Sequence, residues 1–75
     1  MPRLPRVSGA DATRVLERLG FVQVRQRGSH LVLKRTTSGQ PTGCVVPLHK
    51  ELALGTLRGI LRQAGVTAEE FIAKL

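Results

Sequence analysis

Two histidines, His30 and His49, are the residues of this 75-residue sequence with the clearest capacity for acid–base chemistry. His30 lies in RQRGSHLVLKR, residues 25–35, directly after a glycine–serine pair and among basic residues. An imidazole exchanges protons near neutral pH and arginines bind phosphate, so this combination suits chemistry on a phosphodiester. The pattern alone favours a simpler interpretation, in which an exposed strand of a basic protein carries an incidental histidine.

The residues around Gly28 and Ser29 predict a β-hairpin that determines what surrounds His30. FVQVRQR and HLVLKRT, residues 21–27 and 30–36, alternate in polarity and are rich in strand-forming residues. A two-residue loop that begins with glycine is typical of a type II′ turn. The predicted cross-strand pairs are Arg27 with His30, Gln26 with Leu31, Arg25 with Val32, Val24 with Leu33 and Gln23 with Lys34.

This register divides the hairpin into two faces, because paired residues share a face. The face expected to join the core contains Val22, Val24, Leu31 and Leu33. The other face contains Gln23, Arg25, Arg27, His30, Val32 and Lys34. Sheets with helices on one side commonly leave the other side to solvent. Arg25, Arg27 and Lys34 are therefore the predicted phosphate-positioning residues, and Gly28 and Ser29 of the turn are predicted to bind the same ligand.

The rest of the chain predicts helices before and after the sheet. Residues 1–7 predict an extended basic arm, and Ser8 is the expected N-cap of a helix with the apolar stripe Ala12, Val15, Leu16 and Leu19. A long turn at 37–43 precedes a third strand, GCVVP, residues 43–47. Thr56 is the expected N-cap of a helix that ends at Gly65 and has the apolar stripe Leu57, Ile60, Leu61 and Ala64. Thr67 with Glu70 predicts a short last helix with the apolar stripe Ala68, Phe71, Ile72 and Leu75. The expected fold is α+β, α-β-β-β-α with an antiparallel sheet plus a short C-terminal helix, in one domain over residues 1–75.

A second contact for a polyanion is expected where the helix after the sheet begins. Lys50, Gly55, Thr56 and Arg58 lie at or just before this helix N-terminus, where free backbone N–H groups and the helix dipole favour a phosphate. Lys50 and Arg58 are therefore predicted to extend a track for a nucleic-acid backbone. The alternative is that Thr56 only caps the helix, while Arg58 forms a solvated stripe with Arg62.

Composition narrows the class of partner and of chemistry. A formal net charge of +7 favours a polyanionic partner such as nucleic acid, or an acidic protein. Cys44 is the only cysteine, which excludes an intrachain disulfide and favours a reducing cytoplasm. The sequence has no Cys/His set with zinc spacing, no carboxylate cluster for magnesium and no apolar run of about 20 residues. We therefore expect no metal, no cofactor and no membrane association.

Taken together, the motifs resemble the HicA toxins, also called the YcfA-like family, of bacterial and archaeal toxin–antitoxin systems. The resemblance covers about residues 10–65 and is carried by LGF, RQRGSH, VPLHKEL and GTLRGILRQAG in this order and spacing. It implies a fold like the double-stranded RNA-binding domain, with helices on one face of a three-stranded sheet. It also implies a metal-independent endoribonuclease that cleaves mRNA and a HicB-type antitoxin that blocks it. The catalytic histidine of the family's GSH motif corresponds to His30.

Some points stay open at the level of the sequence. Many relatives carry a further histidine or an aromatic residue soon after GSH, whereas this chain has Leu31, Val32 and Leu33. The general acid is His49, a lysine, water, or His30 in another protonation state. Residues 66–75 lie beyond the shared motifs and are expected only to pack. Two rival classes are a noncatalytic RNA-binding module with a similar fold and a domain that binds only an acidic protein.

Overall fold

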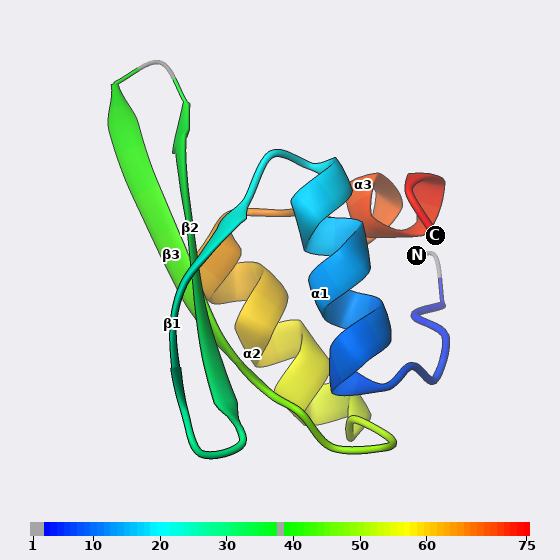
Figure 1. Ribbon diagram of the computed structural model, residues 1–75. Coiled ribbons are helices and arrows are strands. Elements are labelled where there is room, and N and C mark those ends of the chain that lie inside the picture. The colour runs from blue at the N-terminus through cyan, green and yellow to red at the C-terminus, as the bar shows by residue number, and fades with distance from the viewer. Residues whose placement is uncertain (1–2, 38) are drawn as a thin grey trace.

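The chain forms a three-stranded antiparallel sheet with helices on one side of it (Figure 1). This computed structural model describes residues 3–37 and 39–75. The elements are α1 (Gly9–Arg18), β1 (Val22–Arg27), β2 (His30–Thr37), β3 (Gln40–Pro47), α2 (Leu54–Ala64) and α3 (Ala68–Ala73). The strand order is β1-β2-β3, so β2 is the central strand. The predicted α+β class and order of elements are confirmed.

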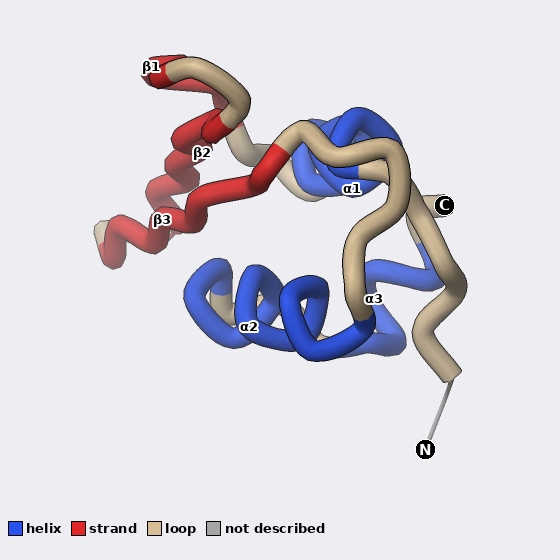
Figure 2. The backbone as a smooth tube through the Cα atoms, turned by 90° about the horizontal axis from the view of Figure 1, so that it is seen from below, coloured by secondary structure: helices blue, strands red, loops and turns tan. Residues whose placement is uncertain are grey.

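The helices and the sheet form two layers, with the core between them. Figure 2 shows α1 and α2 side by side in the second layer, with α2 on the β3 side. The side chains of Leu31 and Leu33 on β2, and of Cys44 and Val46 on β3, are buried against this layer. The largest fully buried side chains are Phe71, Leu16, Leu33, Leu57, Val15 and Val46. No helix of residues 3–37 and 39–75 covers the opposite side of the sheet, which we call the open face.

The first and last helices, α1 and α3, begin where their sequences predict. The Ser8 hydroxyl accepts a hydrogen bond of 2.9 Å from the Asp11 N–H, and the Asp11 carboxylate accepts one from the Ser8 N–H. Thr67 and Glu70 form the same reciprocal capping box at the start of α3. The predicted stripe of α1 is confirmed at Ala12, Val15 and Leu16, which are buried, with Leu19 partly buried. In α3, Phe71 is fully buried, whereas the last residue of its predicted stripe, Leu75, is 51% exposed.

The start of α2 differs from the prediction. Ala53 is the N-cap, in extended conformation and without a side-chain cap, so Thr56 lies inside the first turn. The physical reason lies in the preceding residue, because Leu52 is buried and its N–H donates to the Val7 carbonyl oxygen at 2.8 Å. This anchor lets the helix begin directly after it. The predicted stripe of Leu57, Ile60, Leu61 and Ala64 is buried, and Gly65 ends the helix with a φ of 70°.

The predicted N-terminal arm has neither helix nor strand over residues 3–8, yet part of it packs on the core. Val7 is buried in the core, and Leu4 packs against it. Arg6 forms an ion pair with Glu51 at 3.4 Å. Met1 and Pro2 lie outside the described residues. The N-terminal segment therefore packs against the core and the loop before α2, and is not a free arm.

The hairpin register is confirmed near the turn and wrong farther from it. Arg27 pairs with His30, Gln26 with Leu31 and Arg25 with Val32, as predicted. A β-bulge between Gln23 and Arg25 then shifts the pairing by one residue, so Gln23 pairs with Leu33 and Val22 with Lys34. Since one residue of slip exchanges the faces of a strand, Gln23 and Val22 change sides.

The predicted core positions Val22 and Val24 are therefore wrong. Both side chains are exposed, at 61% and 51%, and every residue of β1 is exposed. The cause is that β1 is an edge strand that the helix layer does not bury. The predicted long turn at 37–43 is also wrong, because β2 continues to Thr37 and β3 begins at Gln40. Ser38, in the short connection, lies outside the described residues.

Acid is expected to weaken the starts of α1 and α3. Hydrogen bonds with Arg14 and Ser8 lower the pKa of Asp11 below its ordinary value of 3.8, and bonds with Thr67 lower the pKa of Glu70 below 4.5. The folded state therefore favours the charged carboxylates. Their stabilisation is present above these ordinary values and is lost as the pH falls through the lowered ones. Urea denaturation should show a falling free energy of unfolding from about pH 4.5 downward.

The control for this prediction is the double variant Asp11→Asn, Glu70→Gln. It keeps hydrogen-bonding side chains at both positions but has no carboxylate to protonate there. Its free energy of unfolding should depend less on pH over the same window. An equally steep acid dependence in the variant would contradict the assignment to the two capping boxes.

Candidate active site

His30 is the first residue of the central strand and follows the hairpin turn directly. Gly28 has a φ of 56°, a positive value that glycine adopts without steric cost and that a type II′ turn needs at its first central residue. The Gln26 side-chain amide donates a hydrogen bond of 3.0 Å to the Gly28 carbonyl oxygen. His30 itself is exposed. Its imidazole is therefore accessible to a large substrate.

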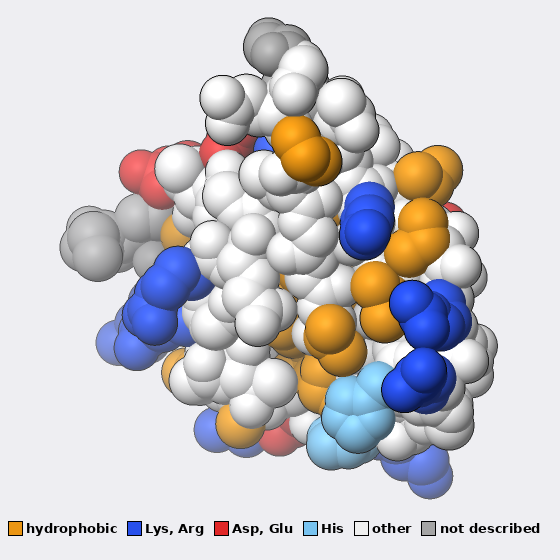
Figure 3. Space-filling model, turned by 90° about the vertical axis from the view of Figure 1, so that its left-hand side faces the viewer, with side chains coloured by type: hydrophobic (Ala, Val, Ile, Leu, Met, Phe, Trp, Pro, Cys, Tyr) orange, Lys and Arg blue, Asp and Glu red, His pale blue; other side chains and the backbone are white. Residues whose placement is uncertain are grey.

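The open face gathers the predicted cations around His30. Arg27 is its cross-strand partner, and the next pair on the same face is Arg25 with Val32. Lys34 follows on the same side of β2, and all three cations are exposed. Figure 3 shows apolar side chains along the middle of this face, with histidine at its lower end and lysine and arginine beside them. The sequence reasoning thus placed these residues together correctly.

Spacing along β2 separates the roles of the cations. Cross-strand partners have Cα atoms about 4.5–5.5 Å apart, so the side chains of Arg27 and His30 can contact the same bound group. Lys34 is four residues farther along the strand, about 13 Å at ~3.3 Å per residue. Lys34 therefore suits a neighbouring phosphate of a bound chain, and not the one that the imidazole contacts.

The cations of the open face have no acidic partners among the described residues. The two ion pairs among the described residues join Arg6 with Glu51 and Arg14 with Asp11, and none of these four residues is in a strand. All five acidic residues lie outside the three strands. The positive charge of Arg25, Arg27 and Lys34 is consequently available to a polyanion, whose displaced counterions add to affinity.

The loop after β3 braces the turn that carries His30. The Leu48 N–H donates a 2.7 Å hydrogen bond to the Ser29 carbonyl oxygen, and Pro47 pairs with His30. The next residue, His49, accepts a 2.9 Å hydrogen bond at its carbonyl oxygen from the N–H of Gly9, the first residue of α1. Both histidines thus lie at the same end of the sheet. His49 is exposed, so its imidazole is also accessible.

Gly9 is required by this brace, and sequence reasoning missed it. A Cβ at this buried glycine would overlap the Pro47 carbonyl oxygen and crowd the Leu48 Cα. Only a residue without a side chain lets α1 begin against the loop. A glycine directly after an N-cap serine is a weak signal, because the contact is made with residues about 40 positions away in the sequence.

Lys50 and Arg58, the predicted extension of the site, lie at different places. Lys50 is exposed in the loop directly after His49 and so borders the histidine end of the sheet. Arg58 is exposed on α2 and lines a groove with residues of α3 and of the N-terminal segment. The structure therefore brings Lys50 to the loop beside the candidate site, while Arg58 belongs to another surface.

One further residue beside the site, Gln63, was not indicated by the sequence reasoning. The Gln63 side chain of α2 accepts a 3.4 Å hydrogen bond from the Val45 N–H, so the helix covers part of the β3 edge. Beside this contact is a shallow hollow of about 410 Å³, which Val32 and Lys34 also line. Gln63 is not part of the apolar stripe of α2, and its hydrogen-bond partner, Val45, is on β3. No local pattern in the sequence therefore indicated this contact.

Two neighbours of the site have structural roles. The Arg35 guanidinium lies 4.6 Å from the ring centroid of Phe21 and donates to the Leu19 carbonyl oxygen at 3.0 Å, so it joins β2 to the end of α1. Cys44 is buried, and burial raises the pKa of its thiol to about 11. A thiol of this kind is protonated at neutral pH and is a poor nucleophile.

Within residues 3–37 and 39–75, no group of three or more His, Cys, Asp or Glu side chains is placed to hold a metal ion. No helix there has both the length and the apolar character needed to cross a bilayer.

The small α+β fold, the exposed histidine and the cations on the open face agree with what the sequence motifs predict for a toxin of the HicA type. The sequence model of the family described as "HicA toxin of bacterial toxin-antitoxin" matches residues 9–66. The match covers most of the chain and includes the hairpin, the loop after β3 and α2. The chain therefore belongs to the HicA toxin family. No curated protein matches it.

Proposed function

We propose that the chain is the toxin of a type II toxin–antitoxin system and cleaves mRNA as a metal-independent endoribonuclease, with His30 as general base. The observation that supports this proposal best is the geometry at the turn. His30 is exposed at the end of the central strand and in register with Arg27, on a face without acidic residues. Family membership supplies the toxin class.

In the proposed reaction, the neutral imidazole of His30 takes the proton of an RNA 2′-hydroxyl. The 2′-oxygen attacks the adjacent phosphorus, and the bond from phosphorus to the 5′-oxygen breaks. The products are a 2′,3′-cyclic phosphate and a 5′-hydroxyl end. Arg27 and Arg25 stabilise the negative charge that develops on the phosphoryl oxygens, a kind of electrostatic stabilisation that is usually the largest single contribution to enzyme catalysis. Lys34 and Lys50 hold neighbouring phosphates, and Arg58 is the predicted contact for RNA that continues along α2.

The leaving 5′-oxygen needs a proton, and His49 is the proposed general acid. Its support is the brace described above, which holds the backbone of His49 at the same end of the sheet as His30. A lysine, water or the protonated His30 are the alternatives. The rate of RNA cleavage after each histidine is replaced distinguishes between these candidates.

The proposed partner is a HicB-type antitoxin, and the proposed compartment is the cytoplasm. The toxin–antitoxin family supports a protein partner of this kind. The net charge of +7 supports both an RNA substrate and an acidic inhibitor, since each carries the complementary charge.

The proposed chemistry is tested with purified protein and RNA in EDTA. RNA should be cleaved, with 2′,3′-cyclic phosphate ends, because no step requires a metal. A substrate with 2′-deoxy sugars should remain intact, because it lacks the attacking oxygen. Cleavage of the deoxy substrate at an undiminished rate would exclude this mechanism. RNA that is bound but stays intact would favour the noncatalytic RNA-binding module.

A further inference from the structure

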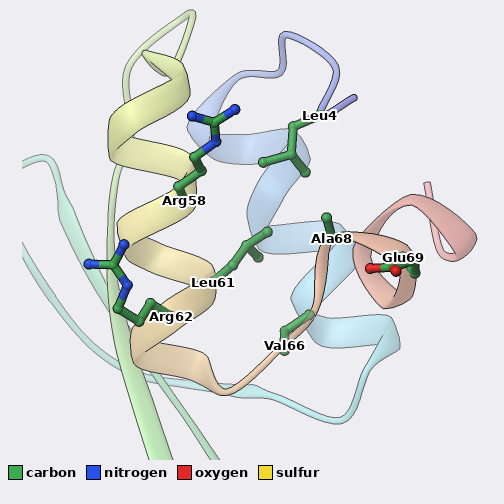
Figure 4. Close-up of a pocket in the computed structure, with 7 residues that line it drawn as sticks. All are labelled: Leu4, Arg58, Leu61, Arg62, Val66, Ala68 and Glu69. Carbon is green, nitrogen blue, oxygen red and sulfur yellow. The ribbon is translucent and has the colours of Figure 1, made fainter. Parts of the chain in front are cut away.

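The helix side of the molecule contains a groove with an aliphatic floor and a charged rim (Figure 4). Its volume is about 560 Å³, within the range of ligand-binding clefts. Leu61 and Val66 are buried at its floor, and Leu4 and Ala68 are half-buried in its walls. The rim carries charged side chains from two helices, Arg58 and Arg62 of α2 and Glu69 of α3.

This groove is separate from the candidate active site. Its lining comes from α2, α3, Val66 between them and Leu4 of the N-terminal segment, with no strand residue. The residues assigned to base and phosphate contacts on the open face are all strand residues. Arg58 is the one residue that the groove shares with the predicted RNA track.

The two arginines of the rim repel each other and lack local compensation. Arg58 and Arg62 are exposed and four residues apart, a spacing at which like charges destabilise a helix. Neither makes an ion pair or side-chain hydrogen bond with another described residue, and α2 contains no acidic residue. A carboxylate bound between them would remove this repulsion and form charge-assisted hydrogen bonds.

The floor of the groove favours a protein segment over RNA. Unpaired bases bind to proteins largely by stacking on aromatic side chains. The only aromatic residues, Phe21 and Phe71, are 2% and 0% exposed and do not line the groove. An aliphatic side chain instead gains free energy when it leaves water for such a surface.

We propose that this groove is a docking site for a segment of the antitoxin in which a leucine-like side chain is flanked by a carboxylate. The aliphatic side chain occupies the floor between Leu61 and Val66, and the carboxylate lies at Arg58 and Arg62. Glu69, on the opposite wall, repels the same carboxylate and so orients the segment toward α2. This inference rests on the proposed function for the identity of the partner. It adds a contact surface remote from His30.

The test compares the affinity of the cognate antitoxin for four forms of the full chain by titration calorimetry. Arg58→Gln with Arg62→Gln removes the cationic rim, and Glu69→Gln removes the repelling charge. The control is Arg14→Gln with Arg18→Gln, an exposed arginine pair with the same spacing on α1 that removes the same net charge. Because Arg14 pairs with Asp11 and Arg18 donates to the Lys74 carbonyl oxygen, the free energy of unfolding of this control is measured beside its affinity. Circular dichroism confirms that each form is folded.

The Arg58→Gln, Arg62→Gln double variant (the groove pair) should bind the antitoxin about tenfold or more weakly than the unchanged chain. The affinity of the Arg14→Gln, Arg18→Gln double variant (the control pair) should stay within about twofold of the unchanged chain. Glu69→Gln should strengthen binding. Equal losses from the two arginine pairs would show that only net charge matters and would overturn the proposal. So would an unchanged affinity of the groove pair, or a loss confined to RNA binding in a parallel titration with an RNA oligonucleotide. If the unchanged chain fails to bind the antitoxin, the partner assignment itself is wrong.

Discussion

Replacing His30 with alanine is expected to abolish RNA cleavage and growth arrest while the fold stays intact. The imidazole is exposed and makes no side-chain hydrogen bond with any other described residue, so little stability is lost with it. General base catalysis typically contributes about 10²–10⁴-fold in rate, and the variant should lose at least that factor. Cleavage of a labelled RNA and growth after induction measure the loss, with circular dichroism as the check on folding.

Thr36→Ala is the matched control for this prediction. Thr36 is exposed on the same face of β2 as His30 and Lys34, and it has no assigned role in the reaction. It should cleave RNA at the rate of the unchanged chain. A folded His30→Ala variant that remains as toxic as the parent would remove the catalytic assignment, and a similar loss from Thr36→Ala would mean that the whole face is sensitive.

His49→Ala extends the same measurement to the general acid. If His49 protonates the leaving oxygen, its loss should slow cleavage to a similar degree, and the double variant should be little slower than either single one. Residues that act in one step are strongly non-additive in this way. An active His49→Ala variant would assign the proton transfer to a lysine, water or His30.

The reliable part of the sequence prediction was local. The turn at Gly28 and Ser29 needs only two residues, and the pairing next to it follows directly from its geometry, so Arg27 and Arg25 were placed correctly beside His30. The predicted N-cap at Ser8 and the predicted capping box of Thr67 and Glu70 are similarly local. Alternation predicted a buried β1, but whether a strand is covered depends on where the helices pack. Val22 and Val24 therefore appear in the sequence as core residues and in the structure as exposed ones.

The contacts that complete the site connect distant parts of the sequence. Gly9 contacts the loop at residues 47–49, Leu48 contacts the turn, and Gln63 covers the β3 edge. No periodic pattern contains these pairings, because each depends on the tertiary fold. Family resemblance indicated His30, but the contacts of Pro47 and Leu48 that fix the backbone around it are found only in the structure.

This brace gives the second large expected effect, the loss of stability in Gly9→Ala. Within a helix, alanine is normally favoured over glycine by about 1 kcal/mol. Here the added Cβ would overlap the Pro47 carbonyl oxygen, which is backbone and lies where α1 meets the loop. The Gly9 N–H would also lose its bond to the His49 carbonyl oxygen. We expect a net cost of roughly 2–4 kcal/mol from overpacking and the lost hydrogen bond.

A cost of that size is large for this chain, whose total stability is expected to be roughly 4–11 kcal/mol at its length. Urea denaturation measures it, and Gly59→Ala is the control, because Gly59 is inside α2 with open space around its Cβ position. That substitution should stabilise the fold slightly. If Gly9→Ala were as stable as Gly59→Ala, the contact between α1 and the loop would not be tight. Where Gly9→Ala still folds, its RNA cleavage should fall more than its RNA affinity, because the displaced loop carries His49 and braces the turn of His30.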